Sequence, residues 1–432
     1  MDDLEDAHRC GHVVGMNFSA TLSRGHVFDF AVVTYSLASY TKVVMRKRCA
    51  ILTSFDPYVF KGGIETYTRQ MIDVLRGHDC AVDIYHTQCL PKTAGIQSSP
   101  ASFHSPFLNS LSQVGHTFYH VDHLYDFVIA HAFFGFAYSP PRIPAFTIFH
   151  STHAQYAEAN RKMFSPEWYF EVKYLFGLGA ERLSTVGKKV IAVSDAVAHE
   201  VATQYGATDI ATVLTGLDQT VFFPRLYKKE LRDQFAIPRD AFVGVFLARW
   251  GIDKAVDVLQ EIMDATPDVF WMLILGTGAS CPLQGRPNTR IIENIERNEV
   301  ATILSCADFL FHPSRYEGFG LAVAEALACG LPVVAAPVGV AQSVLQTPPL
   351  RSLLLPSYHE GKQRVITAAV EAIVRLRQDE DLRRACAAAG LEVASQSLNL
   401  AQWKHGFLAT LGLASEKGAE RQLPLPKEGY AS

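Results

Sequence analysis

The chain has 432 residues, of which 49% are hydrophobic and 19% are charged. It is long enough for two or three domains, and its composition is typical of a folded globular protein. Its net charge of -4 gives no electrostatic case for a nucleic-acid partner, which usually needs a concentrated basic face. The sequence lacks a run of about 18 uncharged apolar residues, so we predict no transmembrane helix.

The two ends of the chain differ in pattern from its middle. Met45 begins MRKRCAILTSFDPYVFKGGIE, which looks like the start of a first strand and its loop, so residues 1–44 are predicted to be an upstream extension or flexible leader. Residues 413–432 are predicted to be a flexible tail. The eight cysteines include no CxxC pair and no metal-like spacing. Such thiols indicate a reducing compartment, the cytoplasm, with a peripheral position at the inner face of the membrane left open.

Apolar, strand-like runs alternate with helical stretches along the chain. The first series lies at 49–53, 81–85, 127–130, 146–149 and 190–193, and the second at 242–247, 270–275, 309–311, 333–335 and 353–355. This alternation predicts parallel sheets with crossover helices. The fold class is therefore α/β, with two doubly wound, Rossmann-like domains facing across a cleft. Turn residues and charges between about 215 and 240 indicate a linker with a helix.

The most informative stretch is 312–336, which reads HPSRYEGFGLAVAEALACGLPVVAA. A short buried strand ends near His312, glycines 318 and 320 allow a sharp turn, and a helix is predicted from about 321 to 329. A helix that begins at a glycine-rich turn offers free amides and a positive dipole end to phosphates. Glu325, one turn inside, can accept both hydroxyls of a ribose, and Glu317 can reach the sugar beyond the phosphates.

This spacing of two glutamates, with Gly-Phe-Gly after the first and Gly-Leu-Pro-Val-Val after the helix, resembles the signature of retaining GT-B glycosyltransferases, especially glycosyltransferase family 4. The resemblance implies transfer of a sugar from a UDP- or GDP-linked donor to a glycan or lipid-linked acceptor, without a cofactor or metal. It implies an acceptor-side domain at 45–219, completed by a helix at about 399–412. The donor domain is expected at 220–398.

Two cations follow the strand that begins the second series. Arg249 and Lys254 lie five residues apart in FLARWGIDK, where they resemble the arginine and lysine of the family's second domain. Fixed cations stabilise the charge that a departing diphosphate accumulates. The amides of Phe319 and Gly320 are expected to bind the same phosphates. Read alone, an arginine and a lysine at this spacing form a solvated surface pair.

Further candidates follow other strands. Gly62 and Gly63 open a helix after the first strand, and Gly63 is expected to approach the donor phosphates. His150 falls where related enzymes have a histidine beside the reacting sugar, and it is the first-domain catalytic candidate with Glu317. His131, which ends DFVIAH, is a weaker candidate expected to point into the cleft. Gly276 and Gly278 resemble the glycine loop near the base.

Several alternatives stay open. Ala248, Ala255 and Thr215 replace residues usual in the family, so a catalytically silent GT-B protein that binds a nucleotide sugar or steadies a partner transferase is the second hypothesis. A sugar-nucleotide epimerase or a sucrose- or trehalose-phosphate-forming synthase is a rival among enzymes. Residues 155–178 either contact a lipid-linked acceptor at a membrane surface or form a core helix. Family members build cell-envelope polysaccharide and lipopolysaccharide, which suggests the pathway.

Overall fold

The structure is a computed structural model of the chain. It describes residues 46–53, 56–59, 62–86, 106–226, 228–276, 281–293 and 295–414. The expected upstream extension at 1–44 lies outside the described residues, as do all but the first two positions of the expected tail.

The first sheet contains six parallel strands in the order β2-β1-β3-β4-β5-β6. Their bounds are Lys47–Leu52 (β1), Cys80–Tyr85 (β2), Phe127–His131 (β3), Ala145–Phe149 (β4), Lys189–Ala192 (β5) and Ile210–Thr212 (β6). Ile51 of β1 pairs with Ile84 on one side and with Ile129 on the other. The order therefore reverses at β1, and ligands bind beyond the strand ends at such a point in open α/β sheets.

Helices connect the strands of this sheet. They are α1 (Gly63–Arg76), α2 (Pro106–Tyr119), α3 (His153–Ala159), α4 (Pro166–Phe170), α5 (Arg182–Thr185) and α6 (Asp195–Glu200). A π-helical stretch, Glu171–Glu181, joins α4 to α5, and a second one, Val201–Tyr205, extends α6. The amphipathic pattern of α1 explains its packing, because Tyr67, Met71 and Leu75 are buried on one face.

The second sheet contains five parallel strands in the order β11-β10-β7-β8-β9. Their bounds are Phe242–Ala248 (β7), Val269–Leu275 (β8), Thr289–Glu293 (β9), Phe309–His312 (β10) and Val333–Ala335 (β11). The order reverses between β7 and β10, so the loops that follow these two strands meet at one edge. Trp271, Phe309 and Phe311 fill the core of the sheet.

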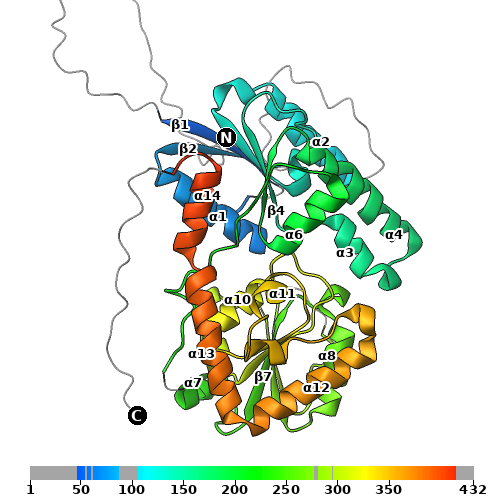
Figure 1. Cartoon of the computed structure of the whole chain (residues 1–432), viewed down its shortest axis with the longest axis vertical. Coiled ribbons are helices and arrows are strands. Elements are labelled where there is room, and N and C mark those ends of the chain that lie inside the picture. Colours follow the sequence, from blue (N-terminus) through cyan, green and yellow to red (C-terminus); the bar gives the residue numbers. More distant parts are fainter. Residues whose placement is uncertain are drawn as a thin grey trace, which may run out of the picture. The chain divides into compact units, whose positions relative to one another are not determined.

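The helices of this region are α7 (Lys228–Gln234), α8 (Val256–Ala265), α9 (Arg297–Cys306), α10 (Leu321–Ala328), α11 (Val340–Val344), α12 (Lys362–Gln378), α13 (Glu380–Ser397) and α14 (Leu400–Thr410). Figure 1 shows α8 and α12 packed together beside β7. Helix α13 packs against α10, and an added Cβ on Gly390 would lie 2.9 Å from a methyl carbon of Leu327.

The last helix returns to the first sheet. Leu217, just after β6, bridges Asn399, and α14 then runs close to α1 (Figure 1). The indole Nε1 of Trp403 donates a hydrogen bond of 3.2 Å to the Tyr67 hydroxyl, and Trp403 is only 2% exposed. The tryptophan is therefore a packing anchor between segments distant in sequence.

The structure differs from the predictions at three places. The short strands β6 and β9 were not predicted, because each lies at a sheet edge and has a partly exposed, mixed sequence rather than a continuous apolar run. The strand expected at 353–355 is wrong. Leu350–Leu353 forms a 3-10 turn instead, and Leu354 makes only an isolated bridge to Ala335.

Candidate functional site

A cavity of about 1220 Å³ is lined by loops that follow strands of both sheets. The first sheet contributes residues after β1 and β4, and the second contributes residues after β7, β8 and β10. Of the predicted site residues, those that line the cavity are Gly62, Gly63, His150, Arg249, Lys254, Gly276, Glu317, Phe319, Gly320 and Glu325. Gly278 lies outside the described residues.

The loop after β10 forms one wall of the cavity. Gly320 has a φ of 90°, a left-handed conformation that favours glycine, and it is the N-cap of α10. No side chain caps this helix, so the positive end of its dipole and its first-turn amides face the cavity where Phe319 and Leu321 lie. This wall suits a phosphate group.

A glycine is required at position 318 for a different reason. Here the loop after β10 approaches the end of β4 in the first sheet very closely. A Cβ at this position would lie 1.7 Å from the carbonyl oxygen of His150, which no side chain can tolerate. The Ser194 hydroxyl donates a 2.6 Å hydrogen bond to the Gly318 carbonyl and also caps α6 by accepting from the Val197 amide. The loop after β10, which contains Glu317, is thus held against the first sheet.

Glu317 lies at the centre of a polar cluster. Its Oε1 accepts hydrogen bonds from Lys254 Nζ at 2.7 Å and from Ser314 Oγ at 2.9 Å. His312 Nε2 lies 3.3 Å from the same oxygen. Burial favours a raised pKa, but the Lys254 ammonium and the His312 ring outweigh it and hold the pKa of Glu317 well below its usual range. The carboxyl is therefore an anion at neutral pH.

Both predicted cations contact one buried carboxylate. Arg249 donates to Asp253 Oδ2 at 2.8 Å, and Lys254 Nζ lies 3.5 Å from the same oxygen. Arg249 is mostly exposed at the cavity, whereas Lys254 is largely buried between Asp253 and Glu317. Asp253 was missed in the sequence, because a single acidic residue between two basic ones has no distinctive pattern.

Glu325, on α10, has a partner that the sequence did not indicate. The Arg297 guanidinium, from the start of α9, donates to Glu325 Oε1 at 2.7 Å. Burial raises the pKa of Glu325, and the adjacent Arg297 opposes that effect. Arg297 also lies over the Phe222 ring at 5.1 Å, which holds the guanidinium in place.

The start of α1 lies beside the start of α10. An added Cβ on Gly63 would lie 3.5 Å from Leu321 Cδ1, so the two helix N-termini adjoin. No side chain caps α1 at Gly62. Two positive dipole ends therefore face the cavity in which Arg249 and Lys254 lie.

The two histidines predicted on the first sheet occupy different places. His150 lines the cavity, whereas His131 is completely buried and does not, so the expectation that it points into the cleft is wrong. The two rings are tilted by 25° and meet edge to edge with centroids 5.0 Å apart, and His131 Nδ1 lies 2.9 Å from His150 Nε2. Burial lowers the pKa of His150 to about 4.

A third histidine, His153, also lines the cavity. Its Nδ1 lies 2.7 Å from Oε1 of Glu181, a fully buried carboxylate, and its backbone amide donates to Oε2 at 2.8 Å. Burial favours a lowered pKa for His153, but the Glu181 charge outweighs it and raises the pKa. When His153 is protonated, it and Glu181 form an ion pair whose charges balance at this edge of the cavity.

A hydrogen-bonded network between the lobes was also missed by sequence reasoning. The Tyr316 hydroxyl accepts from the Thr152 amide at 2.7 Å and donates to Glu200 Oε2 at 2.9 Å. The Thr152 hydroxyl donates to the same carboxylate oxygen at 2.6 Å. Burial raises the pKa of Glu200 to about 7, against the opposing effect of these hydrogen bonds.

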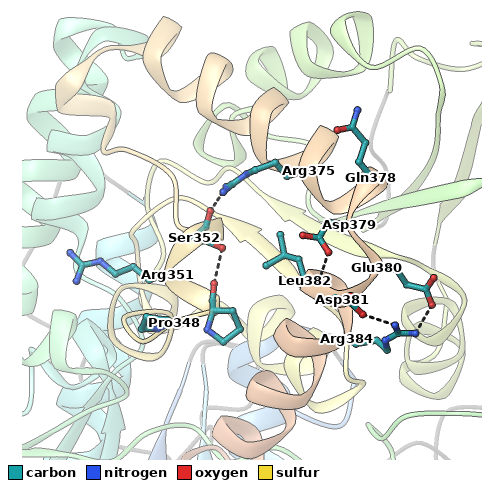
Figure 2. Close-up of a pocket in the computed structure, with 11 residues that line it drawn as sticks. Pro348, Arg351, Ser352, Arg375, Gln378, Asp379, Glu380, Asp381, Leu382 and Arg384 are labelled. Atoms are coloured by element: carbon teal, nitrogen blue, oxygen red, sulfur yellow. Dashed lines mark hydrogen bonds and ion pairs between the residues drawn. The ribbon is translucent and has the colours of Figure 1, made fainter.

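A second hollow lies near the start of α13 and holds none of the predicted donor-site residues. Figure 2 shows two of its arginines in contact with neighbouring protein groups: Arg384 binds Glu380 and Asp381, and Arg375 donates to the Ser352 carbonyl. Two of its arginines are therefore already engaged. The first cavity is the candidate site.

The described part of the chain contains neither a metal cluster nor a membrane-spanning helix. No group of three or more His, Cys, Asp or Glu side chains there is arranged to hold a metal ion. Within the same residues, no helix has the length and apolar character needed to span a membrane.

Comparison with known proteins gives two family matches. The model described as Glycosyltransferase Family 4 matches residues 61–221, and the model described as glycosyl transferases group 1 matches residues 228–393. The chain is 29% identical over 271 residues to a D-inositol 3-phosphate glycosyltransferase of Nocardioides sp., which covers 56% of this chain and 57% of that protein. It is 30% identical over 231 residues to a GDP-mannose-dependent phosphatidylinositol dimannoside mannosyltransferase of Mycobacterium tuberculosis, covering 50% and 55%. The chain thus spans just over half the length of these relatives.

Solved structures share the fold over most of the chain. Sucrose-phosphate synthase of Thermosynechococcus elongatus superposes with a TM-score of 0.69 at 19% identity, over 85% of this chain and 98% of that one. The Anabaena HepE protein, in complex with UDP-glucose, gives 0.59 at 17% identity, over 84% and 99%. With two parallel sheets and both halves matched by family models, the chain belongs to the GT-B glycosyltransferases of family 4, the glycosyl transferases group 1.

Proposed function

We propose that this protein transfers a sugar from a nucleoside diphosphate donor to an acceptor hydroxyl with retention of configuration and without a metal ion. The observation that carries the proposal is the convergence, in one cavity, of two helix N-termini, two cations and two carboxylates. The helix N-termini and the cations suit a diphosphate. The two carboxylates suit the sugar and ribose hydroxyls on either side of the diphosphate.

The donor diphosphate is assigned to the wall formed by Arg249, Lys254 and the amides of Phe319 and Gly320. As the glycosidic bond breaks, negative charge grows on the departing phosphate. Fixed cations and helix dipoles stabilise this charge more strongly than that of the intact donor, which is the condition for rate acceleration. The same groups supply the positive charge that a divalent ion provides in other transferases, and Gly63 brings the α1 dipole to the same place.

Glu317 is assigned to the sugar. Because it is ionised, it cannot donate a proton as a general acid. It accepts hydrogen bonds from sugar hydroxyls and stabilises the positive charge that develops at the anomeric carbon. Glu325 is assigned to the ribose, because Arg297 occupies only its Oε1 and fixes the carboxylate in orientation.

The donor domain is proposed at 220–398 and the acceptor-side domain at 45–219 with the helix at about 399–412. The first screen of acceptors should include inositol phosphate and phosphatidylinositol, because the names of the relatives specify inositol compounds. A role in building a cell-envelope glycan from the cytoplasmic side follows from such acceptors.

An aromatic surface supports peripheral contact with a membrane. Trp168, Phe170 and Tyr174 are 45%, 56% and 44% exposed on the helical segment that begins at Pro166. Such rings insert at the interface of a bilayer. Flotation with phosphatidylglycerol vesicles tests this, and a Phe170→Ser variant should float less. Equal flotation of both proteins would remove this part of the proposal.

The donor assignment is tested by thermal shift with UDP-glucose, UDP-N-acetylglucosamine, GDP-mannose and the free nucleotides, each with and without EDTA. One nucleotide family should stabilise the wild type equally in both conditions and should fail to stabilise Glu325→Ala. If every nucleotide leaves the melting temperature unchanged, the donor site is wrongly assigned. Binding without turnover would favour the alternative of a catalytically silent protein that steadies a partner transferase.

Catalysis is tested with Glu317→Gln, which is similar in size and removes the charge. We expect kcat to fall by roughly 100-fold or more while nucleotide affinity changes little, because the carboxylate acts on the transition state. Unchanged kcat would refute the role of Glu317.

A further inference from the structure

Thr68, His131 and His150 form a chain of hydrogen bonds. The Ile64 carbonyl at one end of this chain determines which atom donates at each step. Thr68 Oγ1 lies 2.7 Å from the Ile64 carbonyl oxygen and 2.9 Å from His131 Nε2. A carbonyl oxygen only accepts, so the single hydroxyl proton of Thr68 lies between Thr68 and Ile64. Thr68 must then accept the hydrogen bond from His131, which places the ring proton of His131 on Nε2.

The position of the proton on His131 determines which ring nitrogen of His150 is protonated. His131 is completely buried, and burial together with the neighbouring ring lowers its pKa well below the usual value, so it carries one ring proton only. With that proton on Nε2, His131 Nδ1 is an acceptor, and it lies 2.9 Å from His150 Nε2. His150 must therefore donate from Nε2, which leaves its Nδ1 unprotonated.

Packing holds the His150 ring in this arrangement. The Tyr67 ring lies edge-on to His150 with centroids 4.8 Å apart, and the His131 ring meets the edge of His150 through the hydrogen bond. His150 is the member of this chain of hydrogen bonds that lines the cavity, whereas Thr68 and His131 are buried behind it.

We propose that Thr68 and His131 are positioning residues that hold His150 in the Nε2–H tautomer, so that its Nδ1 accepts a hydrogen bond from a hydroxyl of the donor sugar. This inference rests on the proposed function only in placing the sugar beside His150. It has a consequence for specificity, because an acceptor nitrogen selects a group that can donate. A donor whose hydroxyl at this position is replaced by hydrogen or fluorine is rejected, since neither substituent offers a proton.

The tautomer is measured directly by NMR on the full-length protein with ¹⁵N-labelled histidine at pH 7.5, without ligand. A His150→Gln variant assigns the resonances. Wild type and Thr68→Ser, which keeps the hydroxyl, should both show His150 protonated at Nε2. In Thr68→Val the acceptor is lost, so His131 should donate from Nδ1 and His150 should become protonated at Nδ1. Thr68→Ala gives the same comparison if the valine variant does not fold.

Activity is measured with whichever of UDP-glucose and GDP-mannose the wild type uses. We expect kcat/KM to fall roughly 10- to 100-fold in Thr68→Val and to stay within about threefold of wild type in Thr68→Ser, the difference expected for one hydrogen bond that is lost and one that is kept. The proposal is overturned if wild-type His150 is protonated at Nδ1, or if the valine variant keeps the wild-type kcat/KM. The NMR measurement needs no donor, so it stands even where no nucleotide sugar binds.

Discussion

Replacing Glu200 by glutamine should make the stability of the protein less sensitive to a rise in pH from about 4.5 to about 7. Burial raises the pKa of this carboxyl from its ordinary value of 4.5 to about 7. Between these pH values the folded protein keeps a proton that the unfolded chain has lost, so stability falls as pH rises from about 4.5 to about 7 and then levels. Glutamine remains neutral and can still accept from Thr152 and Tyr316 through its amide oxygen.

The size of the effect follows from the two pKa values. A proton bound roughly 2.5 powers of ten more tightly in the folded state corresponds to about 3 kcal/mol at 1.36 kcal/mol per tenfold. Glu200 is partly exposed, and solvent screening reduces this to about 1–2 kcal/mol. The free energy of unfolding of Glu200→Gln, relative to wild type, should therefore improve by that amount between pH 4.5 and pH 8.

The assay is urea unfolding of both proteins at pH 4.5, 6, 7 and 8, because groups common to both cancel in the difference. Glu230→Gln, at an exposed position of α7, is the matched control and should show no such trend. A difference between Glu200→Gln and wild type that stays constant over this range would refute the argument that burial of the charge governs the carboxyl.

Three further predictions concern strain, steric contact and a buried ion pair. Ala255→Gly should raise the free energy of unfolding by about 1 kcal/mol, because Ala255 has a φ of 53°. Gly318→Ala should weaken nucleotide-sugar binding at least about tenfold by calorimetry, because its Cβ would displace the His150 carbonyl. His153→Gln should cost about 3 kcal/mol, since the buried Glu181 keeps hydrogen bonds from the Tyr205 hydroxyl and the backbone amide of residue 153 but loses the charged imidazole. The raised pKa of His153 means that this loss is largest at pH 6 and shrinks as pH rises through that pKa.

Matched variants separate these effects from general damage. Ala388→Gly, on the exposed face of α13, should lose about 1 kcal/mol, and a similar loss at position 255 would contradict the strain argument. Gly406→Ala, on α14 and outside the cavity lining, has a Cβ that would meet nothing closer than 3.5 Å, so it should bind normally. For His153→Gln, a loss that does not change with pH would show that the pair is uncharged.

The sequence predicted those parts of the site that follow from sheet topology. Glu317 and Arg249 each follow a strand, and in a parallel sheet the ends of neighbouring strands lie at one edge. The strand pattern alone was therefore enough to predict that both residues line one cavity. The edge strands β6 and β9 lacked that pattern, because one side of each is free of neighbours.

The partners of these residues depend on side-chain packing, which leaves no periodic signal. Arg297 contacts Glu325 from 28 positions away, on a helix whose face and rotation are set by the core. His131 had the strand-end position of a ligand-binding residue, yet it lies behind His150 and bonds Thr68 from 63 positions away. A position at the end of a strand predicts that a residue lies at the edge of the sheet, but it does not predict how deeply the side chain is buried.

The return of α14 to the first sheet affects the order in which the protein can mature on the ribosome. Trp403 covers Tyr67, which is 336 positions earlier and whose ring packs on His150. The amino-terminal lobe emerges first during synthesis, but the wall behind His150 is completed only when the final helix has been translated. A chain that ends before α14 would therefore leave this wall uncovered.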